Sequence, residues 1–360
     1  MTRSSAALFT PFSIKSLKLP NRIVMAPMTR SFSPGGVPGD DVAAYYRRRA
    51  EGGVGLIVTE GTYPPDPSAG FDPKVPHLYG EEALSGWRHV VDQVHAAGGH
   101  IFSQLWHVGM QVSSGPAPLE GRHPVGPSGE YAMTQSRIDA AVDAYAQAAR
   151  LAQEVGFDGV ELHGAHGYLI DQFFWEKTNQ RTDGYGGSLV ARTRFAAEAV
   201  RETRRRVGAE FPVALRISQW KIGDYDAKLA RSPDELDQFL RPLVDAGVDL
   251  FHCSQRRFWD AEFEGSNLNL AGWTKKLTAK PTITVGSVTL GADFTKSFGS
   301  PESAPITGID DLLDRLERGE FDLVAVGRAL IANPEWAAKV RAGALGDLRP
   351  FDRSLLTSLI

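Results

Sequence analysis

Residues 139–163, DAAVDAYAQAARLAQEVGFDGVELH, decide the fold. The first part, Asp139–Val155, has the apolar period of a helix and stops at Gly156, a residue that commonly ends helices because it adopts left-handed backbone angles without strain. A short apolar run, Gly159–His163, follows and is typical of a strand buried on both faces of a parallel sheet. A helix followed closely by such a strand is the repeating unit of an α/β protein.

The same alternation continues in both directions along the chain. Eight runs are apolar or rich in β-branched residues and predict strands: Ile23–Ala26, Gly55–Thr59, Ile101–Leu105, Gly159–His163, Val213–Ser218, Leu250–Cys253, Thr282–Val285 and Leu323–Val326. The helices expected between or after them are Asp40–Glu51, Leu84–Ala97, Asp139–Val155, Arg192–Val207, a helix opened by Ser232-Pro233, the weak candidate Asn269–Leu277, Asp310–Arg318 and Glu335–Arg341.

Eight βα units predict a single (β/α)8 TIM barrel, with residues 1–360 as one domain. A doubly wound sheet has the same alternation and is the runner-up, but eight units without a shift in composition favour the barrel. The segment Phe12–Leu19, which precedes the first strand, is expected to form a hairpin that closes the barrel floor.

Composition excludes several classes of protein. The 360 residues carry 39 basic and 43 acidic side chains, so there is no basic excess for nucleic acid or an anionic membrane. The only cysteine, Cys253, permits no intramolecular disulfide, Cys-rich zinc site or iron–sulfur cluster. No apolar run approaches the roughly 18 residues of a membrane span, and Met1–Phe12 lacks the apolar core of a signal peptide. We expect a cytoplasmic protein.

Polar residues follow the predicted strands, where barrel enzymes place their active sites. The chain has no GxGxxG, GxxxxGK[ST], HExxH or GxSxG motif, so a nucleotide phosphate would have to bind in barrel loops. Gly286-Ser287 and Gly327-Arg328, after the last two strands, are candidates because glycine lets backbone N–H groups approach and Arg328 adds donors. An ordinary turn explains these four residues equally well.

A set of spaced motifs is more specific, and together they resemble the Old Yellow Enzyme family. They are Pro27-Met28-Thr29, Gln104-Leu-Trp106-His, His163-Gly-Ala-His166-Gly-Tyr168-Leu-Ile-Asp-Gln-Phe-Phe, Asn179-Gln-Arg-Thr-Asp-Gly-Tyr-Gly-Gly-Ser188, Arg216-Ile-Ser and Val326-Gly-Arg-Ala-Leu-Ile-Ala-Asn-Pro334. The resemblance implies a (β/α)8 barrel with FMN bound non-covalently, reduction by NADPH or NADH, and transfer of the hydride to an activated C=C bond.

The resemblance also implies roles for individual residues. Those implied to hold FMN are Pro27, Met28, Thr29, Gly61, Gln104, Arg216, Gly286, Ser287, Gly327 and Arg328. Those implied to contact substrate are Thr29, Phe71, Trp106, His163, His166 and Tyr168. His163 and His166 would bind the carbonyl or nitro oxygen of an activated alkene, and Tyr168 would donate the proton. An HxxH pair alone offers only two metal ligands, so no metal site is expected.

Three departures from the family pattern concern the substrate pocket. Phe71 stands where many relatives have Tyr, Met110 follows Gly109 where Arg is common, and Gln219 follows Ser218 where proline is more frequent. Trp220, Phe258 and Trp259 are candidates to line a pocket of unusual shape, with a position at the rim without contact as the alternative for the segment of Phe258 and Trp259, and their role stays open. We expect an FMN-dependent ene-reductase, with an FMN-dependent barrel dehydrogenase or a catalytically silent flavin-binding barrel as alternatives. The physiological alkene, the choice of NADH or NADPH, and the state as monomer or homodimer stay open.

Overall fold

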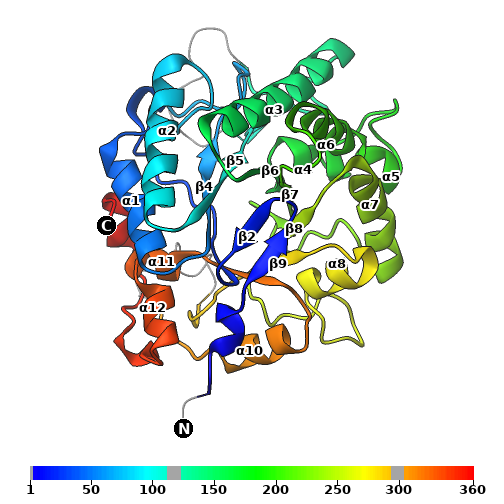
Figure 1. The fold of residues 1–360 in the computed structure, drawn as a ribbon. Coiled ribbons are helices and arrows are strands. Elements are labelled where there is room, and N and C mark those ends of the chain that lie inside the picture. The colour runs from blue at the N-terminus through cyan, green and yellow to red at the C-terminus, as the bar shows by residue number, and fades with distance from the viewer. Residues whose placement is uncertain (1–2, 112–122, 293–303) are drawn as a thin grey trace.

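The computed structural model describes residues 3–111, 123–292 and 304–360. Eight parallel strands form a closed barrel in the order β10-β3-β4-β5-β6-β7-β8-β9 (Figure 1). Their bounds are β3 Ile23–Met25, β4 Leu56–Thr62, β5 His100–Leu105, β6 Gly159–His166, β7 Val213–Lys221, β8 Leu250–Ser254, β9 Thr282–Val285 and β10 Leu323–Val326. All eight predicted strands and the predicted barrel are confirmed, and the doubly wound alternative is wrong.

Helices cover the outside of the barrel, which explains why the strands are buried on both faces. The longer ones are α1 Asp40–Glu51, α2 Glu81–Ala96, α3 Gln135–Val155, α6 Arg194–Val207, α7 Pro233–Ala246, α8 Leu270–Thr278 and α10 Asp310–Glu317. Their ends follow the predicted signals. Ser232 Oγ accepts a hydrogen bond from the Glu235 amide at the start of α7, and Gly156 ends α3 with a φ of 106°.

Several boundaries differ from the sequence-based predictions. The predicted helix Arg192–Val207 is interrupted at Thr193, so that a short α5, Leu189–Arg192, precedes α6. The part of the chain that the structure describes also has four short α-helices: α4 Leu169–Phe174, α5, α11 Arg328–Ala332 and α12 Trp336–Arg341. Of these, α4 and α11 were not predicted, because helices of one or two turns show no measurable apolar period.

The strand β6 runs three residues beyond its predicted end at His163. It continues to His166, with a shift in its pairing to β7 between Gly164 and His166. The extra residues at this bulge carry the second histidine out toward the barrel mouth.

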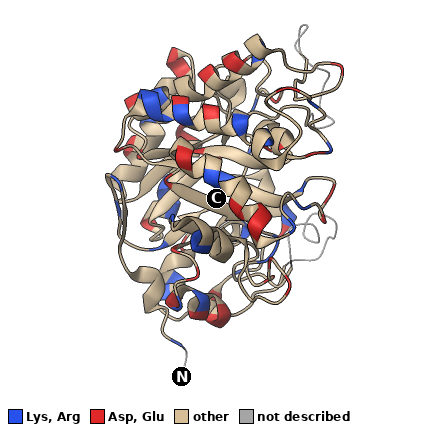
Figure 2. Ribbon diagram, turned by 90° about the vertical axis from the view of Figure 1, so that its right-hand side faces the viewer, with Lys and Arg blue, Asp and Glu red and all other residues tan. Residues whose placement is uncertain are grey.

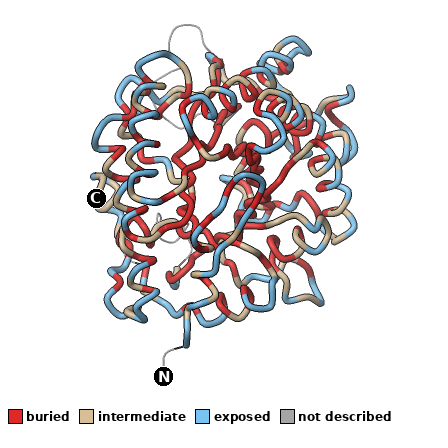
Figure 3. The backbone as a smooth tube through the Cα atoms, viewed as in Figure 1, coloured by how far each residue is buried: buried red, intermediate tan, exposed pale blue. Residues whose placement is uncertain are grey.

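The N-terminal hairpin closes the barrel floor, as predicted. Its strands β1 Phe12–Ile14 and β2 Leu17–Leu19 pair antiparallel. Ile14, Leu17 and Leu19 are buried in one cluster with inward-facing strand residues such as Leu56 and Phe102. Across the described fold, the buried residues lie mainly along the strands and the inner faces of the helices (Figure 3).

The surface carries charges of both signs. Lys, Arg, Asp and Glu alternate along the outer helices in Figure 2, without a face of one sign in that view. Across residues 3–111, 123–292 and 304–360, no helix has both the length and the apolar character required to cross a membrane.

Candidate active site

Two adjoining cavities lie where the barrel strands end. The inner cavity measures about 370 Å³ and the outer one about 1300 Å³, and Thr29 and Ile222 line both. The volume of the inner cavity falls in the range of small-molecule sites. The candidate site is therefore at the C-terminal face of the barrel, where the sequence predicts it.

Residues from six strands or the loops that follow them line the inner cavity. Of the residues implied to hold FMN, those that line it are Pro27, Met28, Thr29, Arg216, Gly286, Ser287, Gly327 and Arg328. They come from segments up to about 300 positions apart in the chain, and the closed barrel brings them together. This grouping is consistent with one ligand that spans the mouth of the barrel.

Gly61 and Gln104 line neither cavity. A Cβ on Gly61 would lie 2.4 Å from the Trp106 ring, so the glycine makes room for that indole. Gln104 donates from Nε2 to Glu161 Oε1 at 2.8 Å, which leaves its amide oxygen to accept. Their roles toward a flavin stay predictions.

The two loops that were candidates for a phosphate site are joined. Arg328 Nη2 donates to the Ala292 carbonyl at 2.8 Å and to Ser287 Oγ at 3.4 Å. Gly286 has a φ of 149°, and a Cβ there would lie 2.8 Å from the carbonyl oxygen of Gln255. Glycine is thus required for the close approach of the loops after β8 and β9.

Arg216 places a buried positive charge beside the inner cavity. Its Nε is buried and, within the described residues, has no hydrogen-bond partner, while Nη2 donates to Ser254 Oγ at 3.4 Å. The carboxylate of Glu161 interacts electrostatically with the Arg216 guanidinium. Its Oε2 also lies 2.6 Å from His252 Nδ1. Because a guanidinium only donates, the unused Nε suits an acceptor atom on a ligand.

These observations fit a singly phosphorylated flavin. The orphaned Arg216 Nε suits an electron-rich ring edge, and Ser287 with Arg328 supplies a hydroxyl and a cation for one phosphate. All three groups line the same inner cavity. The donor set therefore agrees with the FMN that the sequence motifs imply.

His163, His166 and Tyr168 form a second group at the same mouth. The ring centroid of His163 lies 5.0 Å from that of His166 and 5.0 Å from that of Tyr168, both edge to face. His166 and Gly167 have φ values of 66° and 82°, which turn the chain so that the three rings meet. His166 lines the inner cavity and Tyr168 the outer one, whereas His163 lines neither. That both histidines face one small volume therefore stays a prediction.

A buried ion pair supports this turn. Lys221 Nζ donates to Asp171 Oδ1 at 2.7 Å, and both side chains are fully buried. Asp171 Oδ2 accepts the Gly167 N–H at 2.7 Å, and Ser218 Oγ accepts the His166 N–H at 3.0 Å. The backbone between the histidine and the tyrosine is thus held on both sides.

Burial sets the protonation of the three rings. It lowers the pKa of His163 and of His166 well below 6.5, and the nearby Arg216 lowers both further. Burial also raises the pKa of Tyr168 to about 12. At neutral pH the histidines are therefore uncharged and the tyrosine retains its proton.

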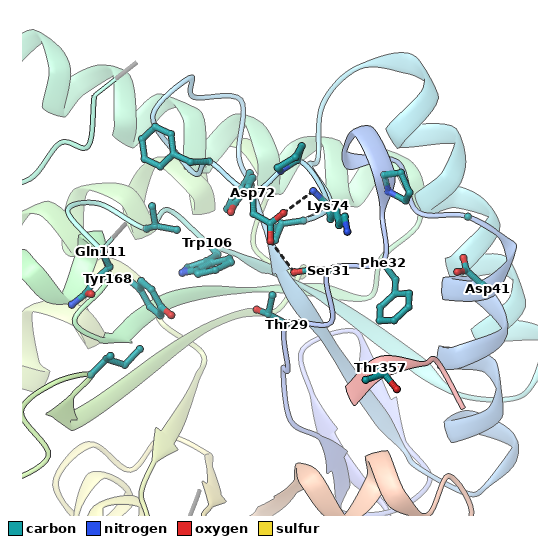
Figure 4. Close-up of a pocket in the computed structure, with 18 residues that line it drawn as sticks. Thr29, Ser31, Phe32, Asp41, Asp72, Lys74, Trp106, Gln111, Tyr168 and Thr357 are labelled. Carbon is teal, nitrogen blue, oxygen red and sulfur yellow. Dashed lines mark hydrogen bonds between the residues drawn. The ribbon is translucent and has the colours of Figure 1, made fainter. Parts of the chain in front are cut away.

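The outer cavity has an aromatic wall (Figure 4). Trp106 packs edge to face against Tyr168 at 5.0 Å and lies 5.4 Å from the Tyr63 ring. Its Nε1 is buried and unpartnered by any described residue, and Phe71 lines the same cavity. Trp106, Phe71 and Tyr168 thus lie where a substrate beside the inner cavity would extend.

Of the three aromatic residues expected to give the pocket an unusual shape, only Trp220 lies in it. It lines the inner cavity and stacks on His166 at 4.3 Å. Phe258 is buried in the hydrophobic core and Trp259 packs against that core, and neither lines a cavity. The pocket role expected of Phe258 and Trp259 therefore does not hold for these two cavities, because both rings pack with the hydrophobic core.

Sequence reasoning assigned no role to several residues around the site. Glu60 Oε2 accepts the backbone N–H groups of Arg30 and Ser31, just after Thr29. Leu356 lines the inner cavity and Thr357 the outer one. Glu60 directly follows a predicted strand, which is where active-site residues of a barrel are expected. Nothing in the sequence places residues 356–357 at the barrel mouth.

Known proteins are similar to this chain over nearly its whole length. Residues 7–345 match the model of the NADH:flavin oxidoreductase / NADH oxidase family. The chain is 35% identical to 12-oxophytodienoate reductase 7 of Oryza sativa subsp. japonica, over 95% of this chain and 89% of that protein. Among solved structures, morphinone reductase in complex with tetrahydroNAD has a TM-score of 0.79 at 31% identity, over 97% and 93% of the two chains. Old Yellow Enzyme from Pichia sp. AKU4542 has a TM-score of 0.80 at 26% identity, over 97% and 90%.

Proposed function

This chain belongs to the NADH:flavin oxidoreductase / NADH oxidase family, and we propose that it reduces the activated C=C bond of α,β-unsaturated carbonyl or nitro compounds. The family relationship makes it an FMN-dependent oxidoreductase that takes hydride from NADH or NADPH. The proposal adds the substrate class and the residues that act on it. The grouping of the His163, His166 and Tyr168 rings, with His166 lining the inner cavity and Tyr168 the outer one, supports it most directly.

The residues that would hold FMN are those of the inner cavity. Arg216 Nε would donate to the ring edge, Thr29 would lie at the flavin edge, and Ser287 with Arg328 would bind the phosphate. The bound flavin supplies the chemistry of accepting a hydride from NAD(P)H and delivering it to the alkene. The fixed charge of Arg216 favours a flavin that carries negative charge.

The two histidines would bind the carbonyl or nitro oxygen of the substrate. Neutral imidazoles donate one hydrogen bond each, and two such donors withdraw electrons from the conjugated C=C bond. Negative charge grows on that oxygen as the β carbon is reduced, so the hydrogen bonds strengthen toward the transition state. Because both rings are held before substrate arrives, little reorganisation is needed.

Tyr168 would protonate the α carbon. Its pKa of about 12 keeps the phenol protonated at neutral pH, and its ring borders both His163 and the outer cavity. A phenol is a suitable general acid for a carbon that carries enolate charge, since the resulting phenolate lies near the Arg216 cation.

The test is an anaerobic absorbance experiment on the purified protein loaded with FMN. NADPH or NADH should bleach the flavin absorbance, and 2-cyclohexenone or a nitroalkene should restore it with formation of the saturated product. Bleaching without recovery by any activated alkene would refute the proposed substrate class. Bleaching by an amine or a hydroxy acid in place of NAD(P)H would indicate a dehydrogenase.

A further inference from the structure

The hydroxyl of Ser254 links two groups of the site. Ser254 is the last residue of β8 and is 3% exposed. Its Oγ lies 2.7 Å from His166 Nε2 and 3.4 Å from Arg216 Nη2. Its carbonyl accepts a hydrogen bond from Trp220 Nε1 at 3.2 Å. The pairing of Ser254 with Ser218 in the barrel register fixes this position.

Counting protons gives the direction of each hydrogen bond. A guanidinium has only donors, so the Ser254 oxygen accepts from Arg216. The oxygen has a second acceptor site, but His166 Nε2 is the one described acceptor within reach of the hydroxyl proton. If Nε2 carried a proton, the buried hydroxyl proton would have no described partner, so the favoured arrangement has Ser254 donating to Nε2. A neutral imidazole carries one proton, and that proton is consequently on Nδ1.

We propose that Ser254 is a positioning residue that keeps the proton of His166 on Nδ1, so that this N–H is a permanent donor to the substrate oxygen. This inference rests on the proposed function and goes beyond it, because it names the donor atom and the residue that enforces it. His166 lines the inner cavity, and no described residue is hydrogen-bonded to its Nδ1.

Burial, the charge of Arg216 and the stacked Trp220 ring keep the His166 imidazole neutral and in place. Burial lowers the pKa of His166, and the positive charge of Arg216 lowers it further, so the doubly protonated ring is disfavoured. Trp220 stacks on the imidazole at 4.3 Å with an interplanar angle of 23°. His163 and Tyr168 lack an equivalent hydroxyl partner among the described residues.

The consequence is selectivity for oxygens that accept hydrogen bonds. A carbonyl, a nitro group or a phenolate accepts from Nδ1–H directly. A His166 ring with its proton on Nε2 would present a lone pair to the same oxygen and repel it. Ser254 thereby selects the ligand class before any chemistry occurs.

The test compares Ser254→Thr with Ser254→Val in the FMN-loaded protein. Threonine and valine have similar size and suit a strand, but only threonine retains the hydroxyl. The first measurement is the ¹⁵N NMR spectrum of labelled histidine, with His166 assigned by its loss in His166→Gln. The second is the Kd of 4-chlorophenol at a pH where it binds as phenolate, followed by the flavin absorbance.

We expect the Nδ1–H signature in the wild type and in Ser254→Thr, with similar Kd values. Ser254→Val should lose the fixed tautomer and bind 4-chlorophenol at least about 10-fold more weakly, as expected for a hydrogen bond to a charged oxygen. If Ser254→Val does not fold, Ser254→Ala replaces it. An Nε2–H or doubly protonated His166 in the wild type would overturn the inference, as would a valine variant that matches threonine.

Neither the NMR spectrum nor the Kd of 4-chlorophenol depends on turnover. The proposed function and the proposed role of Ser254 can therefore be refuted independently. A protein that reduces no alkene but shows the Ser254-dependent tautomer loses only the proposed function. An active ene-reductase whose His166 carries its proton on Nε2 loses only the role of Ser254.

Discussion

Replacing Tyr168 with Phe separates proton donation from packing. The Tyr168 hydroxyl makes no hydrogen bond to another described residue, and the ring contacts with Trp106 and His163, both at 5.0 Å, survive in phenylalanine. The free energy of unfolding should therefore change by no more than about 0.5 kcal/mol. Loss of a general acid should slow reduction of an enone by about 10²- to 10⁴-fold, equivalent to about 3–5 kcal/mol in the barrier.

Stopped-flow absorbance measures the two half-reactions separately. Flavin reduction by NADPH or NADH needs no proton from a tyrosine and should change little in the variant. Reoxidation by 2-cyclohexenone should show the full loss, while a nitroalkene should suffer less because its nitronate can be protonated by water.

The pH dependence adds an independent check on Tyr168. Because its pKa is about 12, this residue should cause no change in the wild-type enone rate between about pH 6 and 9. Equal slowing of both half-reactions would mean that Tyr168 shapes the pocket, and an unchanged enone rate would mean that another group is the acid. Either result would refute the assigned role.

The other predictions concern the flavin phosphate, the buried ion pair and an outer carboxylate. Arg328→Gln should weaken FMN binding by about 10- to 100-fold in a fluorescence titration and leave riboflavin binding unchanged, because riboflavin lacks the phosphate; equal weakening of both would contradict a phosphate role. Lys221→Met should lower the free energy of unfolding by about 3–5 kcal/mol in urea, because it leaves the Asp171 carboxylate buried and unpaired. Adding Asp171→Asn should recover part of that loss, since the amide oxygen still accepts the Gly167 N–H, and no recovery would argue against an unpaired charge as the cause. Burial raises the pKa of Asp158, but hydrogen bonds from two histidines and a backbone amide outweigh it and bring the pKa down to about 2. Because the folded pKa is below the unfolded value, this carboxylate stabilises the protein above about pH 4 and loses that effect as the pH falls toward 2. Asp158→Asn should therefore lower the Tm at pH 7 by the equivalent of about 2 kcal/mol, and the difference should shrink between pH 4 and 2; a difference independent of pH would count against the charge.

Local sequence signals were sufficient for the fold. The eight apolar runs and the glycines that end the helices are properties of neighbouring residues, and each one constrains only its own segment. The hairpin at Phe12–Leu19 was likewise visible before the first strand. The short α4 and α11 were missed because one or two turns carry too little period, and the break at Thr193 left no mark in an otherwise helical pattern.

Motif spacing predicted candidate site residues such as His163, His166 and Tyr168, which are near one another in the chain and have neighbouring rings in the fold. The tertiary structure alone decided which distant groups meet them. Ser254 reaches His166 across 88 positions, and Lys221 reaches Asp171 across 50. Barrel closure and strand register set those contacts, and they depend on every strand between the partners. The same packing decides features that no local pattern shows. It sets the directions of the hydrogen bonds, buries the histidines so that they stay neutral, and places Phe258 in the core and away from the cavity.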